Sequence, residues 1–116
     1  LIHRFGFNPK DILVVPDAQA TRQGILTAFE EHLIKQAKPG DVVVYHYSGH
    51  GSRIFDPNPI VVEPGKEGLN GTFVPVDGNL PDGYPEVGGL VQDIMGHTLF
   101  LLMSGLKTEN VTVVLD

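Results

Sequence analysis

A histidine between two glycines, Gly49-His50-Gly51, follows a run of apolar and aromatic residues from Val42 to Tyr47, with only Ser48 between them. Histidine is the side chain that most often acts as a general acid or base in enzymes. In an open parallel sheet, ligands bind just beyond the carboxyl ends of the strands, so the imidazole of His50 would stand at the rim of the sheet. Its small neighbours would let a substrate backbone approach closely. The alternative is a solvated histidine in a turn whose glycines only permit the bend.

Asp116 follows a second predicted buried strand, Val111 to Leu115, in the same way. Its carboxylate would lie at the carboxyl end of that strand, where it would either line a ligand site or cap a turn. The formal net charge of −6 favours a cationic ligand. No basic run interleaves with aromatic residues, so nucleic acid is not expected as a partner.

Other kinds of site are disfavoured by residue spacing. His46 and His50 have the i, i+4 spacing of a metal-binding pair, but that spacing converges only on a helix, and Gly49 argues against one. We therefore assign no metal ligand and interpret His46 as a core histidine or as one that supports the site residues from behind. The glycine-rich turn lacks the third glycine of a dinucleotide-binding loop and the lysine of a phosphate-binding loop. The sequence has no cysteine, which excludes a disulfide scaffold, a cysteine-ligated zinc site and a thiol nucleophile within these residues.

The composition is that of one globular domain, with 116 residues and 41% hydrophobic residues. The longest apolar stretch, Leu99 to Met103, is far shorter than the roughly 20 residues that a membrane span needs, and no N-terminal signal pattern is present. We expect a cytoplasmic protein without a membrane partner.

The elements that position His50 are predicted from apolar patterns. The continuous apolar run from Asp11 to Val15 is typical of a strand covered on both faces. A helix is predicted to begin after Thr21, a good N-cap, and to end at Lys38-Pro39-Gly40. Together with Val42 to Tyr47, these elements predict a right-handed βαβ unit of a parallel sheet.

The second half of the chain begins with a stretch rich in Gly and Pro, residues 52–89, which predicts a long structured loop. Two short runs within it, Ile60 to Val62 and Thr72 to Val76, are predicted to pair as a small hairpin outside the central sheet. A second helix, Asp93 to Leu106, and the strand Val111 to Leu115 follow.

Four segments carry a family resemblance. The stretch Asp41 to Arg53, DVVVYHYSGHGSR, resembles the histidine strand of caspase-like cysteine peptidases, most closely metacaspases and the prokaryotic orthocaspases. Thr72 to Asp77 is similar to the family's VPVD segment, and Asn110 to Asp116 is similar to the strand that leads into its Asp-Ser-Cys or Asp-Cys-Cys motif. Ala20 to Leu26 also looks like its counterpart, so the resemblance covers nearly the whole chain.

The resemblance implies an α/β, three-layer caspase-like fold with a mainly parallel sheet, of which residues 1–116 would be an incomplete part of a single catalytic domain. The family's first strand and helix would precede Leu1, and the nucleophilic cysteine would fall one or two residues after Asp116. The first strand would lie between the strands at Asp11 and Val42, so we expect these 116 residues alone to be poorly stable. We also expect them to be inactive without the cysteine.

The resemblance also implies roles in a cysteine endopeptidase. His50 matches the catalytic histidine, and the backbone N–H of Gly51 matches a donor of the oxyanion hole. Asp116 matches the acid that lines the pocket for the residue before the cut, which implies cleavage after Arg or Lys. The implied partners are a peptide or protein substrate and the remainder of the protein's own catalytic domain.

No redox or organic cofactor is implied. Some metacaspases bind calcium through acids that follow the histidine loop. Here Asp93 is the only acid in Val91 to Ile94, and Asn70 occupies another position where an acid is expected, so the calcium site is not assigned. Asp77 is interpreted as the end of the VPVD strand, in a structural turn.

Two other function classes remain open from the sequence. One is a non-catalytic caspase-fold pseudo-peptidase that acts as a scaffold or binding module. The other is a flavodoxin-like binding domain whose turn from Gly49 to Ser52 holds a small anion. A cysteine shortly after Asp116 would favour the peptidase over both.

Overall fold

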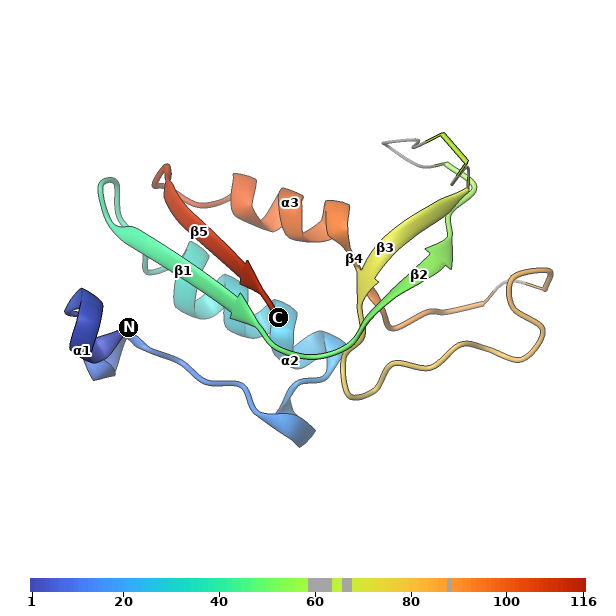
Figure 1. Ribbon diagram of the computed structural model, residues 1–116, viewed down its shortest axis with the longest axis horizontal. Coiled ribbons are helices and arrows are strands. Elements are labelled where there is room, and N and C mark those ends of the chain that lie inside the picture. The colour runs from blue at the N-terminus through green and yellow to red at the C-terminus, as the bar shows by residue number, and fades with distance from the viewer. Residues whose placement is uncertain (59–63, 66–67, 88) are drawn as a thin grey trace.

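The computed structural model describes residues 1–58, 64–65, 68–87 and 89–116. Its strands form two small sheets (Figure 1). Strands β1 (Val42–Tyr47) and β5 (Asn110–Leu115) make a parallel pair. Strands β2 (Gly51–Phe55), β3 (Leu69–Phe73) and β4 (Ile94–Met95) make an antiparallel sheet in the order β2-β3-β4. The fold is therefore mixed α/β, with the chain passing from one sheet to the other between β1 and β2.

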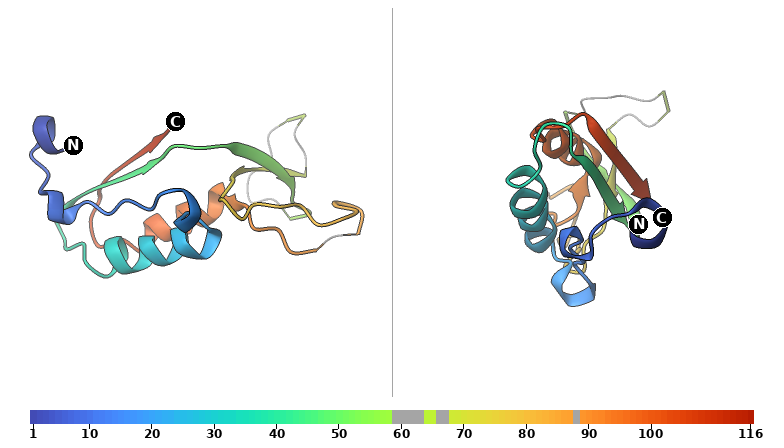
Figure 2. Two further views of the ribbon diagram at one scale, coloured as in Figure 1. Left: turned by 90° about the horizontal axis from the view of Figure 1, so that it is seen from below. Right: turned by 90° about the vertical axis from the view of Figure 1, so that its left-hand side faces the viewer.

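The main helices lie on one side of the β1–β5 pair (Figure 2). Helix α2 (Arg22–Ala28) continues directly into the π-helical segment η3 (Phe29–Ile34), and helix α3 (Gly96–Ser104) precedes β5. The chain begins with the short helix α1 (Ile2–Phe5), followed by the 3-10 turns η1 (Pro9–Asp11) and η2 (Asp17–Gln19). Among the described residues, no helix combines the length and the apolar character needed to cross a membrane.

A small apolar core joins the helices to the parallel pair. Phe29 of η3, Val43 of β1 and Leu99 of α3 are buried. The rings of Phe29 and Tyr45 pack with their centroids 5.5 Å apart. The face of β1 and β5 away from this core is open, as the 60% exposure of Val42 and the 43% exposure of Val114 show.

The predicted start of the first long helix is confirmed. The side chain of Thr21 accepts a hydrogen bond from the backbone N–H of Gly24 at 3.0 Å, which satisfies one of the free donors of the first turn. The strands Val42 to Tyr47 and Val111 to Leu115 are confirmed as well, although neither is covered on both faces. The prediction of a core histidine at His46 is wrong, because its side chain is exposed.

The predicted strand from Asp11 to Val15 is wrong, and with it the βαβ unit. Residues 12–16 have no strand partner among the described residues, and Leu13 and Val14 are 52% and 69% exposed. An apolar run becomes a strand only where a neighbouring strand pairs with its backbone groups. The parallel partner of β1 is instead β5.

One strand of the predicted hairpin pairs with a different segment from the one expected. Thr72 and Phe73 belong to β3, which pairs with β2, a segment that the sequence analysis placed in the loop. The other predicted strand, Ile60 to Val62, lies outside the described residues. The second helix is shorter than predicted, because Ile94 and Met95 pair with β3 before α3 begins at Gly96.

Candidate active site

The carboxyl ends of β1 and β5 bring the histidine loop and Asp116 to one rim. Tyr47 and Leu115 are register partners at the end of the pair. Beyond them, the N–H of Asp116 donates to the carbonyl of Tyr47 at 2.9 Å, and the N–H of Gly49 donates to the carbonyl of Asp116 at 3.1 Å. The hydroxyl of Ser48 lies 3.5 Å from Oδ2 of Asp116. The loop that carries His50 and Gly51 therefore begins beside Asp116, where the ends of the two strands adjoin.

The backbone of His50 is held from two sides. The N–H of Val74 donates to its carbonyl oxygen at 2.9 Å, and the hydroxyl of Tyr47 lies 3.0 Å from the same oxygen. The Tyr47 hydroxyl also lies 2.9 Å from the carbonyl oxygen of Val74, and the Tyr47 ring packs edge-on against Phe73 at 4.9 Å. Burial raises the pKa of Tyr47, so its hydroxyl stays protonated and able to donate at neutral pH.

Gly49 is required by this arrangement. A Cβ on Gly49 would lie 2.9 Å from the hydroxyl oxygen of Tyr47 and 3.1 Å from its Cζ. The glycine therefore leaves the space that the Tyr47 ring fills. The sequence analysis missed the role of Tyr47, and the signal that could have found it is a hydroxyl-bearing aromatic at the end of an apolar strand.

The imidazole of His50 is exposed and has no hydrogen-bond or ion-pair partner in the part of the chain that the structure describes. Its backbone is fixed by Tyr47 and Val74, while its ring is left to solvent. This combination suits a group that must meet a substrate rather than stabilise the fold.

The N–H of Gly51 faces the outer edge of β2. In an antiparallel ladder, hydrogen-bonded residue pairs alternate with pairs that make no bonds to each other. The bonds Val74 N–H to His50 C=O and Asp56 N–H to Gly68 C=O both belong to the hydrogen-bonded class. Gly51 and its partner Phe73 therefore belong to the other class, so the Gly51 N–H points away from β3.

The edge of β2 is open near Gly51 and closed at its far end. β2 is the outer strand of the described sheet. The backbone N–H and C=O of Arg53 point away from β3, as those of Gly51 do. At Phe55, the third outward-facing residue, the N–H donates to the Tyr84 hydroxyl, which also lies 3.1 Å from the Phe55 carbonyl oxygen. The open stretch thus runs from Gly51 to Arg53.

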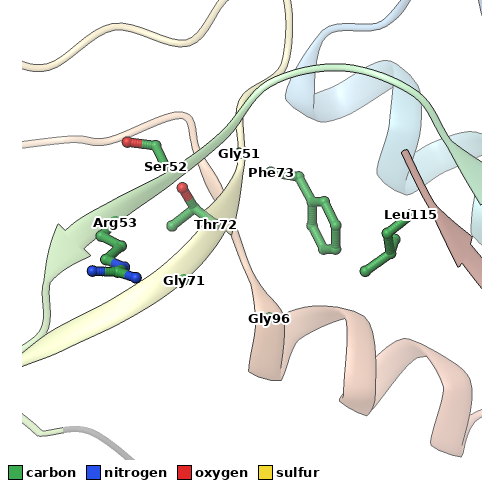
Figure 3. Close-up of a pocket in the computed structure, with 8 residues that line it drawn as sticks. All are labelled: Gly51, Ser52, Arg53, Gly71, Thr72, Phe73, Gly96 and Leu115. Atoms are coloured by element: carbon green, nitrogen blue, oxygen red, sulfur yellow. The ribbon is translucent and has the colours of Figure 1, made fainter. Parts of the chain in front are cut away.

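An open hollow of about 700 Å³ lies over the face of the β2–β3 pair that carries Gly51 and Arg53 (Figure 3). Gly51 lines the hollow, whereas His50 and Asp116 do not. The hollow is lined by residues of β2, β3, α3 and β5: Gly51, Ser52, Arg53, Gly71, Thr72, Phe73, Gly96 and Leu115. The geometry offers an exposed imidazole, an outward backbone donor and an adjoining space for a peptide.

The whole chain, residues 1–116, matches the family model described as metacaspase, peptidase C14 domain. The chain belongs to the metacaspase family. Metacaspase-7 of Arabidopsis thaliana is 43% identical to it over 88 residues, which cover 71% of this chain and 21% of that protein. Metacaspase-1 of Yarrowia lipolytica is 30% identical over 114 residues, which cover 85% of this chain and 20% of that protein.

This metacaspase chain therefore spans about a fifth of the length of these relatives. No solved structure matches it. Membership of the family and the mixed α/β architecture confirm the caspase-like fold class that the sequence analysis expected.

Asp93 and Asn70, the two positions weighed for a calcium site, both form hydrogen bonds within the fold. Oδ2 of Asp93 accepts a hydrogen bond of 2.6 Å from the hydroxyl of Thr72, and both residues are buried. Asn70 donates to Asp56 at 3.2 Å. Within the described ranges, no three His, Cys, Asp or Glu residues come together in a way that could hold a metal ion.

Asp77 lies in a turn, and its carboxylate accepts a hydrogen bond of 2.8 Å from the backbone N–H of Arg22 at the start of α2. The guanidinium of Arg22 donates to the carbonyl of Asp93 at 2.7 Å. These contacts join the first turn of α2 to the segments that follow β3 and precede β4. Asp77 therefore has the structural role expected for it.

Proposed function

We propose that this chain supplies the histidine and the oxyanion donor of a cysteine endopeptidase. The observation that carries the proposal is the backbone pairing of Gly49 with Asp116, because a residue that follows Asp116 would emerge beside His50. The family's nucleophilic cysteine is expected one or two residues after Asp116. Adjacent strand ends would place thiol and imidazole within hydrogen-bond reach, as an activated cysteine requires.

The proposed reaction proceeds through a thioester. The thiolate attacks the carbonyl carbon of the scissile bond, and the N–H of Gly51 stabilises the negative charge that develops on the carbonyl oxygen. His50 holds the thiolate as an ion pair and then protonates the departing amine. A water molecule, deprotonated by His50, attacks the thioester and releases the acid product and the thiol.

Asp116 is proposed to select the residue before the cut. Its carboxylate lies at the end of β5, and its side chain is exposed beside Ser48. A carboxylate binds guanidinium through two parallel charge-assisted hydrogen bonds, and it repels an acidic side chain. The proposed substrates are therefore proteins cleaved after Arg or Lys, with Arg preferred.

The experiment that tests the proposal is peptide hydrolysis by the full-length protein and its His50→Ala variant. Removal of the general acid and base should lower kcat/KM by about 10²- to 10⁴-fold. His46→Ala is the matched control, because His46 is an exposed histidine on β1, the strand that leads to His50; its kcat/KM should stay within about twofold of the wild-type value. Hydrolysis that survives His50→Ala, or a full-length protein that cleaves no peptide, would refute the proposed function.

A further inference from the structure

Arg53 places a cation in the same hollow as Gly51. Side chains two residues apart on a strand project from the same face, so Arg53 shares a face of β2 with Gly51. Figure 3 shows the Arg53 side chain at one end of the hollow and Phe73 and Leu115 at the other.

Between these two ends, the strand face under the hollow is formed partly by glycines. Gly71 is the register partner of Arg53, and Gly51 is the register partner of Phe73. A Cβ on Gly71 would meet no atom within 4 Å, and a Cβ on Gly51 would meet only the Thr72 carbonyl oxygen, at 3.5 Å. Two of these four residues thus lack side chains, which leaves space above this face for the side chains of a peptide that pairs along the outer edge of β2.

The guanidinium of Arg53 is not used by the described fold. Arg53 is exposed and has neither a hydrogen bond nor an ion pair to any residue that the structure describes. The protein as a whole carries 14 Asp and Glu against eight Lys and Arg, so its net field repels an acidic peptide. Arg53 supplies a local attraction, with planar donors that match a carboxylate.

The spacing along β2 fixes where such a carboxylate would be. Two residues of a strand span about 6.7 Å, and an extended substrate has the same spacing. If the attacked carbonyl accepts a hydrogen bond from the Gly51 N–H, then the substrate residue opposite Arg53 lies two residues along the substrate from the one that is attacked. Resting on the proposed function, we propose that Arg53 binds an Asp or Glu side chain two residues from the substrate residue whose carbonyl is attacked.

The test uses full-length protein and pairs of peptides that differ only in Glu or Gln, at each position within three residues of the scissile bond. Glu should raise kcat/KM by about three- to tenfold at a position two residues from the attacked one. In Arg53→Gln this Glu-to-Gln ratio should fall to about one, and in Arg53→Glu a Lys peptide should be preferred. Lys107→Gln is the matched control, since it removes an equal charge from the exposed turn before β5 and should leave the ratio in place.

A ratio that survives Arg53→Gln, an equal loss in Lys107→Gln, or the absence of any acidic preference would overturn the subsite. The same peptide pairs are also titrated onto the full-length His50→Ala protein, where the Kd for the Glu peptide should be about three- to tenfold lower. If wild-type protein cleaves neither peptide, the proposed function fails, and the Kd ratio still decides the subsite by itself.

Discussion

The hydroxyl oxygen of Tyr47 lies 3.0 Å from the carbonyl oxygen of His50 and 2.9 Å from that of Val74. The hydroxyl proton of Tyr47 thus lies between the backbone of His50 and the segment that follows β3. The Tyr47 ring packs against Phe73, which holds the hydroxyl in place. Because these contacts act on the backbone, they set the position of His50 without occupying its imidazole.

Tyr47→Phe should change the rate more than it changes substrate affinity. The variant keeps the ring but loses a hydrogen bond worth about 0.5–1.5 kcal/mol, so unfolding free energy should fall by that amount. We expect kcat to fall by about three- to tenfold with a smaller change in KM. Tyr45→Phe is the control, since the Tyr45 ring packs on Phe29 instead; an equal effect of both variants on kcat would contradict a positioning role.

The tyrosines of β1 should make the protein sensitive to alkali. Burial raises the pKa of Tyr45 above the ordinary value of 10.0, and the neighbouring Tyr47 raises it further. The folded state therefore holds the phenolic proton above pH 10, where the unfolded state begins to release it, so stability should be full below pH 10 and fall above it. Unfolding free energy measured against pH should fall less steeply in Tyr45→Phe; identical slopes in both proteins would contradict the prediction.

Gly49→Ala and Gly51→Ala should differ in stability. The new Cβ at position 49 would overlap the Tyr47 hydroxyl at 2.9 Å, so we expect a loss of about 1–3 kcal/mol. The Cβ at position 51 would make an ordinary contact of 3.5 Å, so unfolding free energy should stay within about 0.5 kcal/mol of wild type. Denaturant unfolding measures both, and similar losses would show that Gly49 is not constrained by Tyr47.

Asp116→Asn should weaken the preference for Arg before the cut. Charge-assisted hydrogen bonds of roughly 1.5–3 kcal/mol correspond to about ten- to hundredfold selectivity, which the neutral amide would not supply. A peptide library in which this position varies measures the preference. Glu109→Gln, an exposed acid just before β5, is the control. A preference for Asp or apolar residues, or one unchanged in Asp116→Asn, would remove Asp116 from the site.

Thr72→Val should destabilise the protein through Asp93. The variant keeps the side-chain shape but removes the donor of a 2.6 Å hydrogen bond to a buried carboxylate. A bond to a charged group contributes about 1.5–3 kcal/mol, and unfolding free energy should fall by that amount. Thr112→Val on exposed β5 is the comparison, with an expected change below about 0.5 kcal/mol. Equal changes would mean that the Thr72 bond contributes little.

Local signals predicted the parts of the fold that local chemistry determines. Thr21 has an oxygen that can accept from the first turn of a helix, and the helix begins there. The apolar runs of β1 and β5 are continuous, and both are strands. The position of Asp116 beside the loop that carries His50 followed from the family resemblance and from the rule that parallel strands end at one rim.

The remaining elements depend on partners far away in the sequence. The run from Asp11 to Val15 has strand composition but lacks a described strand beside it. The segment Gly51 to Phe55 has a single buried residue, Ile54, and becomes β2 only because β3 supplies its ladder. Asp93 lies outside α3 because Ile94 and Met95 pair with β3 before the helix begins, which no helical pattern could reveal. The outward N–H of Gly51 likewise follows from ladder register alone.

The contact of Tyr84 with Phe55 has a consequence for self-association. An exposed strand edge is a template on which further copies of a chain can add and aggregate. Here one hydroxyl engages both outward backbone groups of Phe55, so an added strand loses the ladder bonds at that end of β2. A short peptide can still pair from Gly51 to Arg53, whereas a second copy of β2 cannot pair along its full length. Tyr84 therefore limits the outer edge of β2 to pairing with peptides of a few residues.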